Sequence, residues 1–197
     1  VERGRRHAAR MISAFVEGVA QSLLPCSWIL VVPAVAVALA TRHPGVLVAF
    51  SGAVVATAWI AVAGWIVPPV WVAGIALLVG GALWWRLGAT YVPVVLVGAG
   101  AAWAWQPCVG PELGEALTTA QYDPWAALGG LATFLLGALI VGLAVGLAGG
   151  ALLDRFGKGP SPKVGAGVAM ALGSTMVVGV YPTIASTLAR WSTTLWA

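Results

Sequence analysis

The order of apolar and polar positions divides the chain into long apolar segments. Short interruptions rich in Gly, Pro and charge lie near residues 41–44, 68–69, 86–88, 121–124 and 154–163. The six apolar segments between them cover about residues 11–40, 45–67, 69–86, 91–120, 124–150 and 164–189. A membrane-spanning helix needs about 20 mostly apolar residues, and in lipid a helix satisfies its own backbone groups. The pattern therefore predicts an all-α integral membrane protein with six transmembrane helices.

Composition supports a lipid environment. Hydrophobic residues make up 60% of the chain and charged residues 8%, and the mean hydropathy is +0.96. A soluble domain usually carries about 25% charged residues. The net charge of +4 does not predict a nucleic-acid partner, because the cations lie at segment ends and form no contiguous basic stripe.

Tryptophan and glycine add detail to this pattern. Tryptophans at segment ends are expected to anchor the helices at the membrane interface, and these are Trp65, Trp71, Trp84, Trp85, Trp125, Trp191 and Trp196. Trp28, Trp103 and Trp105 fall near the two cysteines instead. Small residues at four-residue spacing, from Gly142 to Gly150, predict that segment 124–150 packs closely as a buried central helix.

The distribution of cations predicts an orientation. Residues 1–10 form a basic N-terminal segment, and Met11 is an alternative first residue because the chain begins with Val. We call the end of the bundle next to the N-terminus face A and the opposite end face B. Face B is expected to carry Arg42, Arg86, Arg155, Lys158 and Lys163. Counted from residue 1 the two faces tie, but counted from Met11 face B has five cations against Arg190 alone. The positive-inside rule then makes face B cytoplasmic and both termini extracytoplasmic, in the cell (inner) membrane.

The two cysteines share an unusual context. Each follows a proline in the middle of a long apolar segment: LPCSW at residues 24–28 and QPCVGP at residues 106–111. Pro25 and Pro107 each remove a helical hydrogen bond, and such breaks persist in lipid only where protein or water satisfies the freed groups. Three spans separate equivalent points, so the two segments cross in opposite directions. The pattern predicts two inverted three-helix repeats, residues 11–90 and 91–197, with the first and fourth helices broken.

The breaks give the cysteines a chemical role. A thiol in apolar surroundings is inert, whereas a helix N-terminus stabilises its thiolate. We therefore expect Cys26 and Cys108 to be the reactive, catalytic pair, since both of the only two cysteines occupy this position. The alternative is that they are apolar fillers. The residues expected to break the helices around the site are Pro25, Pro33, Pro107, Gly110 and Pro111.

Polar residues near the cysteines are candidates for support. Glu112 and Glu115 lie on one helix face and are candidates for moving protons, unless they lie close enough to face A to reach water. Gln21 precedes the first break, and Gln106 is placed to bond backbone freed by Pro107. Two cysteines and two histidines far from them cannot build a closed zinc site, so no metal and no cofactor beyond the cysteine pair is expected.

The second motif carries a resemblance. Pro107-Cys108-Val109-Gly110-Pro111-Glu112-Leu113-Gly114 resembles the fourth-helix signature of the CcdA family of cytochrome c biogenesis membrane proteins, which is similar to the transmembrane domain of DsbD. The resemblance covers essentially the whole chain, with six spans and a cysteine in spans one and four. It implies a thiol–disulfide oxidoreductase that passes electrons from cytoplasmic thioredoxin, through Cys26 and Cys108, to extracytoplasmic thioredoxin-like proteins. The chain departs from the family at Ile29, where relatives usually carry a proline.

A transporter is the alternative function. CcdA-like folds look similar to small exporters of amino acids or metals, and a cysteine pair could hold a soft ion such as Cu(I). Such a protein ought to line its route with polar residues, and these spans are poor in them. The sequence leaves open the external acceptor, the oligomeric state and which cysteine is attacked first.

Overall fold

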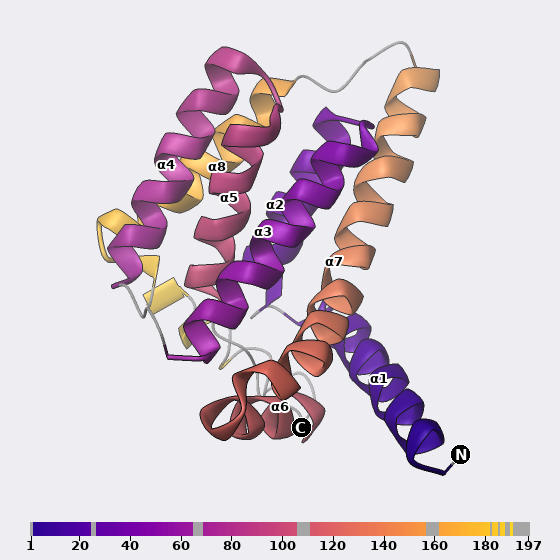
Figure 1. The fold of residues 1–197 in the computed structure, drawn as a ribbon. Helices are drawn as coiled ribbons and strands as arrows, with labels where there is room; N and C mark the ends of the chain where they lie inside the picture. The colour runs from indigo at the N-terminus through magenta and orange to yellow at the C-terminus, as the bar shows by residue number, and fades with distance from the viewer. Residues whose placement is uncertain are drawn as a thin grey trace.

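The protein is a bundle of α-helices (Figure 1). The computed structural model describes residues 2–24, 27–64, 69–105, 111–156, 162–181, 183–184, 186–187 and 190. No strand occurs among these residues. The principal helices are α1 (Glu2–Gln21), α2 (Trp28–Ala40), α3 (Pro44–Val62), α4 (Val70–Leu87), α5 (Tyr91–Ala104), α6 (Pro111–Tyr122), α7 (Pro124–Arg155) and α8 (Pro162–Val177).

Several of these helices have the length and composition of a membrane span. Three are long and apolar enough to cross a bilayer on their own: α3, α4 and the stretch Ala127–Arg155 of α7. The apolar helices α2, α5 and Lys163–Val177 of α8 are shorter. The structure is therefore that of an all-α membrane protein.

The first and fourth apolar segments are each divided into two helices. In the first, α1 ends at Gln21 and α2 begins at Trp28. In the fourth, α5 ends at Ala104 and α6 begins at Pro111. Each interruption contains one Pro-Cys pair of the sequence. Pro33, by contrast, lies buried inside α2 and does not end it. It sits in the second turn, where a proline costs one hydrogen bond, to the carbonyl of residue 29.

Other helix ends follow local sequence signals, with two differences. Helix α3 begins with Pro44 at its first position, and α4 ends at Gly88, whose φ of 77° suits glycine. Helix α1 extends back to Glu2, so the basic segment is helical. The sixth segment was expected to run to residue 189, but α8 ends at Val177. A turn at Gly179 follows it, where φ is 78°.

Helix α7 organises the bundle. In Figure 1 it runs the height of the molecule, with α1 against its lower part and α2 against its upper part. A Cβ at Gly137 would lie 2.3 Å from the carbonyl oxygen of Phe15 in α1, and one at Gly146 would lie 2.6 Å from that of Val35 in α2. The predicted close packing of the fifth segment is thus present, because glycine lets the helix backbones touch.

The remaining helices complete the core on the other side. Helix α4 packs against α8 and α5, and α5 also packs against α3. Trp84 of α4 is 1% exposed and lies against Gly165 of α8, so it belongs to the core and its expected place at the interface is wrong. Trp71, Trp85 and Trp125 are exposed, as anchors would be. Sequence position alone does not separate the buried Trp84 from Trp85, which is 49% exposed on the same helix.

Candidate functional site

The candidate site is described through the helix ends that border the two interruptions. Outside the described residues lie Pro25, Cys26, Gln106, Pro107, Cys108 and Gly110. Pro111 and Glu112 belong to the first turn of α6, but their side chains are not among those described. The described borders are residues 17–24 and 27–30 at the first break, and residues 101–105 with α6 at the second.

The chain at the first break satisfies its own backbone groups. The hydroxyl of Ser22 donates to the carbonyl of Val19 at 2.6 Å. The amide of Leu24 donates to the carbonyl of Gln21 at 3.0 Å, and that of Ser27 to Leu24 at 3.0 Å. The last carbonyls of a helix lack helical partners, and here short turns within the same segment supply them. Ser22 and Ser27 are both buried, so these bonds are made away from solvent.

The second break is bordered by a buried aromatic residue and a bond from a distant element. Trp105 follows α5 directly and is buried, with its ring centroid 6.0 Å from that of Phe134 in α7. The carbonyl of Ala104, the last residue of α5, accepts a hydrogen bond from the Tyr181 hydroxyl at 3.3 Å. The amide of Trp105 donates to Ala102 at 3.3 Å. The end of α5 is thus held by α7 and by the chain beyond α8.

One residue of α7 contacts the borders of both breaks. Phe134 places its ring against Trp105 and its carbonyl oxygen against Gly18, where a Cβ would lie only 2.0 Å away. Gly18 lies three residues before the end of α1. Helices α2 and α5 also pack against each other. The fold therefore brings the end of α1 and the end of α5 to the same part of α7.

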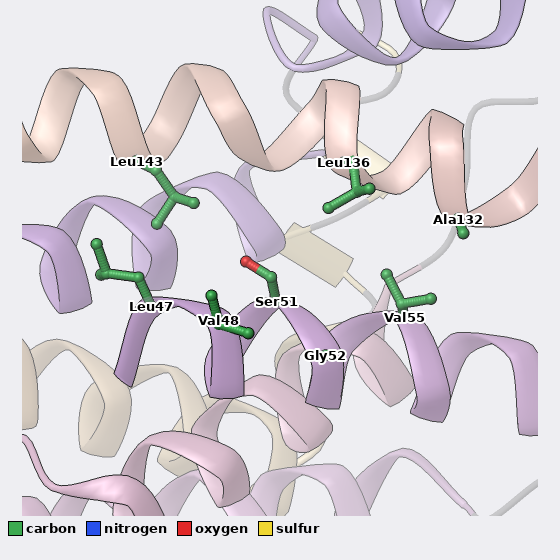
Figure 2. A pocket seen from close by; sticks show the side chains of 8 residues that line it. All are labelled: Leu47, Val48, Ser51, Gly52, Val55, Ala132, Leu136 and Leu143. Carbon is green, nitrogen blue, oxygen red and sulfur yellow. The ribbon is translucent and has the colours of Figure 1, made fainter. Parts of the chain in front are cut away.

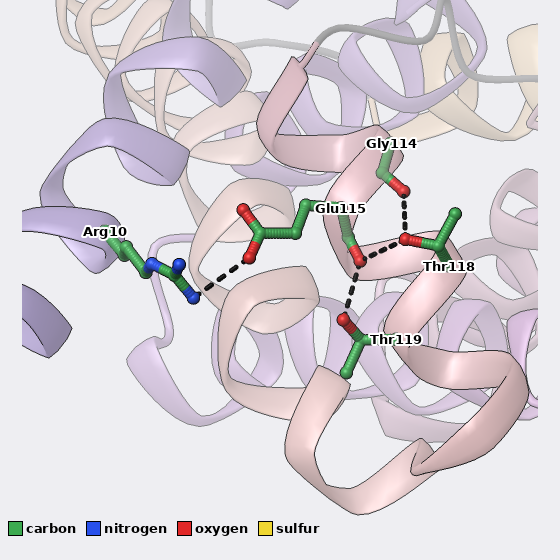
Figure 3. A network of polar contacts seen from close by, with 5 residues as sticks. All are labelled: Arg10, Gly114, Glu115, Thr118 and Thr119. Carbon is green, nitrogen blue, oxygen red and sulfur yellow. Dashed lines mark hydrogen bonds and ion pairs between the residues drawn. The ribbon is translucent and has the colours of Figure 1, made fainter.

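Glu115 lies in an exposed polar cluster between α6 and α1. Its carboxylate pairs with Arg10 at 2.9 Å, and the side chains are 53% and 69% exposed respectively (Figure 3). The hydroxyls of Thr118 and Thr119 donate to its backbone carbonyl at 2.9 and 2.8 Å. Of the two interpretations of the acidic pair, this geometry agrees with the one that places Glu115 near water.

Two indole groups next to the second break are unusual donors. The Nε1 atoms of Trp103 and Trp105 are buried and, within the described part of the chain, have no hydrogen-bond acceptor. A buried donor without an acceptor costs free energy, so either indole N–H would donate to a polar group placed beside it. The position of these two tryptophans near Cys108 follows from the sequence, but their lack of an acceptor among the described residues does not.

An apolar groove lies between α3 and α7. Its volume is about 430 Å³ (Figure 2). The residues that line it are Leu47, Val48, Ser51, Gly52, Val55, Ala132, Leu136 and Leu143. Ser51 contributes the one polar side chain of this set. The groove therefore lacks the polar lining that a route for ions or amino acids requires.

The contacts that Tyr181 and Phe134 make at the borders of the breaks were not predicted from the sequence. Tyr181 is 77 residues from the carbonyl that it contacts, and no local pattern encodes such a pairing. The Gly-Val-Tyr-Pro run at residues 179–182 was the available signal that the sixth segment ends early.

Comparison with known proteins supplies no relative. The chain matches none of the protein-family models, curated proteins or solved structures with which it was compared. Its function is therefore argued from its own residues.

Proposed function

We propose that the protein carries reducing equivalents across the membrane by thiol–disulfide exchange at Cys26 and Cys108. One observation carries this proposal: the only two cysteines of the chain each fall in an interruption between two apolar or amphipathic helices, α1–α2 and α5–α6. The donor is cytoplasmic thioredoxin, and the acceptor is an extracytoplasmic thioredoxin-like protein that serves cytochrome c maturation.

Packing between the halves supports an inverted repeat of residues 11–90 and 91–197. Helix α1 packs on α7, and its counterpart α5 packs on α3, so the first helix of each half lies on the second span of the other half. A Cβ at Gly98 of α5 would lie 3.0 Å from the carbonyl oxygen of Phe50 in α3, as one at Gly18 of α1 would meet that of Phe134 in α7. The third spans, α4 and α8, pair with each other. Six spans related by such a repeat place both breaks at a similar depth.

The chemistry is a transfer of two electrons. A thioredoxin thiolate attacks one sulfur of the Cys26–Cys108 disulfide, which forms a mixed disulfide and releases the other cysteine as a thiolate. The second thiolate of thioredoxin then attacks the thioredoxin sulfur of the mixed disulfide. Thioredoxin leaves oxidised, and Cys26 and Cys108 become a dithiol. The dithiol then reduces the disulfide of the external acceptor by the same two steps, which restores the Cys26–Cys108 disulfide.

The helix termini explain how thiols between apolar helices remain reactive. Cys26 directly precedes Ser27, the N-cap of α2, and Cys108 lies three residues before the start of α6. The partial positive charge of a helix N-terminus stabilises a nearby thiolate, which is the form that attacks a disulfide. Donor and acceptor are soluble proteins on opposite faces, so access to the pair must alternate between faces.

The first test asks whether the two cysteines form a reversible disulfide. Purified protein is alkylated with a maleimide reagent of high mass, with and without prior reduction. We expect both cysteines to be protected before reduction and modified after it. A pair that binds Cu(I) but never forms the disulfide would support the transporter instead.

Trapping tests the direction of exchange. Thioredoxin that lacks its second cysteine is first activated as a mixed disulfide with thionitrobenzoate. The remaining thiolate of either Cys26→Ser or Cys108→Ser is expected to displace thionitrobenzoate and to accumulate a mixed disulfide with thioredoxin that reductant releases. The double variant Cys26→Ser/Cys108→Ser is the matched control and should trap nothing. If both single variants reduce the acceptor at the wild-type rate and trap nothing, thiol–disulfide exchange is not the function.

A further inference from the structure

Tyr181 makes a hydrogen bond to the end of α5, directly before the second Pro-Cys segment. Its hydroxyl donates to the carbonyl of Ala104, the last residue of α5, at 3.3 Å. In an uninterrupted helix this carbonyl would accept the amide of Cys108, four residues later. In this structure a side chain from the far end of the chain bonds that carbonyl, at the point where α5 ends.

The turn that follows α8 presents Tyr181 to this carbonyl. The amide of Val180 donates to Thr175 at 2.9 Å and that of Gly179 to Met176 at 3.2 Å. With φ of 78° at Gly179, these bonds form a Schellman motif, which ends the helix and redirects the chain. A residue with a Cβ adopts this φ only with strain, so the position of Tyr181 depends on Gly179.

The first break has a different arrangement. Among the described residues around it, the carbonyls at the end of α1 are bonded within the same segment, by Ser22 and by the turn at Leu24. A contact made within one segment moves with that segment. The contact of Tyr181 instead joins α5 to a residue 77 positions away, so it fixes the end of α5 relative to the turn that follows α8.

We propose that Tyr181 is a positioning residue for Cys108. By holding the carbonyl of Ala104 it fixes where α5 ends, and hence where the chain that carries Cys108 begins. This sets how readily Cys108 pairs with Cys26. The proposal rests on the redox function proposed above, and it makes Tyr181 the link between the turn after α8 and the reactivity of one cysteine of the pair.

The first experiment measures the redox equilibrium of the full-length protein in glutathione buffers. Tyr181→Phe keeps the ring and removes the hydroxyl. We expect the equilibrium constant for forming the Cys26–Cys108 disulfide to fall about three- to tenfold, which corresponds to a rise in reduction potential of about 15 to 30 mV. Tyr122→Phe is the matched control, because Tyr122 is 89% exposed at the end of α6, and its equilibrium should equal that of the wild type.

The second experiment reads each cysteine alone and does not require the disulfide. In a Cys26→Ser background, Tyr181→Phe is expected to speed alkylation of Cys108 by N-ethylmaleimide at least threefold. The dependence of this rate on pH gives the alkylation rate constant of the Cys108 thiolate. In a Cys108→Ser background, alkylation of Cys26 should not change. Gly179→Ala keeps the tyrosine but moves it, so it should also speed the alkylation of Cys108. This variant serves as the test if Tyr181→Phe does not yield folded protein.

The outcomes separate the two proposals. Unchanged Cys108 alkylation together with an unchanged equilibrium would overturn the role of Tyr181. Equal acceleration at Cys26 and Cys108 would also overturn it, because that result indicates general loosening. A wild-type protein that never forms the disulfide refutes the redox function, while the alkylation rate of Cys108 still tests Tyr181.

Discussion

At the scale of single residues, the contacts of Glu115 separate it from the chemistry of the cysteines. Its carboxylate is paired with Arg10, and both side chains are more than half exposed. An exposed ion pair contributes about 0–1 kcal/mol, and a carboxylate already bonded to a guanidinium is a weak candidate for accepting a proton from a thiol. The pair instead joins the middle of α1 to the first half of α6.

We therefore expect Glu115→Gln to leave the thiol chemistry unchanged. In a Cys26→Ser background, the pH profile of Cys108 alkylation should match that of the parent, and thermal stability in detergent should fall by less than about 1 kcal/mol. Arg10→Gln should have the same small effect on stability, because it breaks the same pair. A shifted pH profile for Glu115→Gln alone would return this carboxylate to the proton path.

At the scale of elements, the closest packing is where α1 crosses α7. Gly18 and Gly137 face each other's helix, and a Cβ on either would meet a backbone carbonyl oxygen, at 2.0 Å from Phe134 and 2.3 Å from Phe15 respectively. Backbone atoms cannot turn aside as a flexible side chain can, so added volume must separate the helices. This crossing also fixes the end of α1 that leads into the first break.

Gly137→Ala is expected to destabilise the protein by about 1–3 kcal/mol, because α1 must move away from α7. Gly129→Ala in the same helix is the matched control, since nothing lies within 4 Å of its added methyl group. Alanine favours a helix over glycine by up to about 1 kcal/mol, so the control should be neutral or stabilising. Thermal unfolding in detergent measures both, and equal melting temperatures for the two variants would contradict this account of the crossing.

The elements also show which parts of the fold a sequence encodes locally. Proline is the first residue of α3, α6, α7 and α8, and Pro69 and Gly88 cap α4. These residues alter the backbone wherever they occur, so such helix ends are encoded locally. Helix α8 ends early at Gly179 within an apolar run, and hydropathy alone does not reveal such an end.

Contacts between distant segments explain the rest. Trp84 and Trp85 share one local context, yet only Trp84 is buried, against α8 where Gly165 makes room for it. The Tyr181 hydroxyl reaches the Ala104 carbonyl because the end of α5 lies next to the turn that follows α8. The cysteines were predicted as a pair from their shared context, and their pairing remains a prediction.

At the scale of the whole molecule, the cations that follow Met11 lie mostly at one end of the bundle. Arg42, Arg86, Arg155 and Lys163 lie at the ends of α2, α4 and α7 and at the start of α8, which meet at face B (Figure 1). Two of them make contacts there: Arg42 pairs with Asp154, and Lys163 lies 5.4 Å from the centroid of the Trp85 ring. The fold thus assembles at face B four of the five cations that the sequence assigns to it, and Lys158 lies outside the described residues. Counted from Met11, face B carries more cations than face A.

This clustering predicts that face B is cytoplasmic, because Lys and Arg in short loops are retained on that side. A protease site inserted in the full-length chain between Ala89 and Thr90 is expected to be protected in sealed spheroplasts and cut in inverted membrane vesicles. A site inserted between Tyr122 and Asp123, in the turn from α6 to α7 at the opposite face, should show the reverse, and both turns are accessible in detergent as a control for cleavage. Cleavage of the first site and protection of the second in spheroplasts would invert the orientation, and thioredoxin would then have to approach the cysteines from face A.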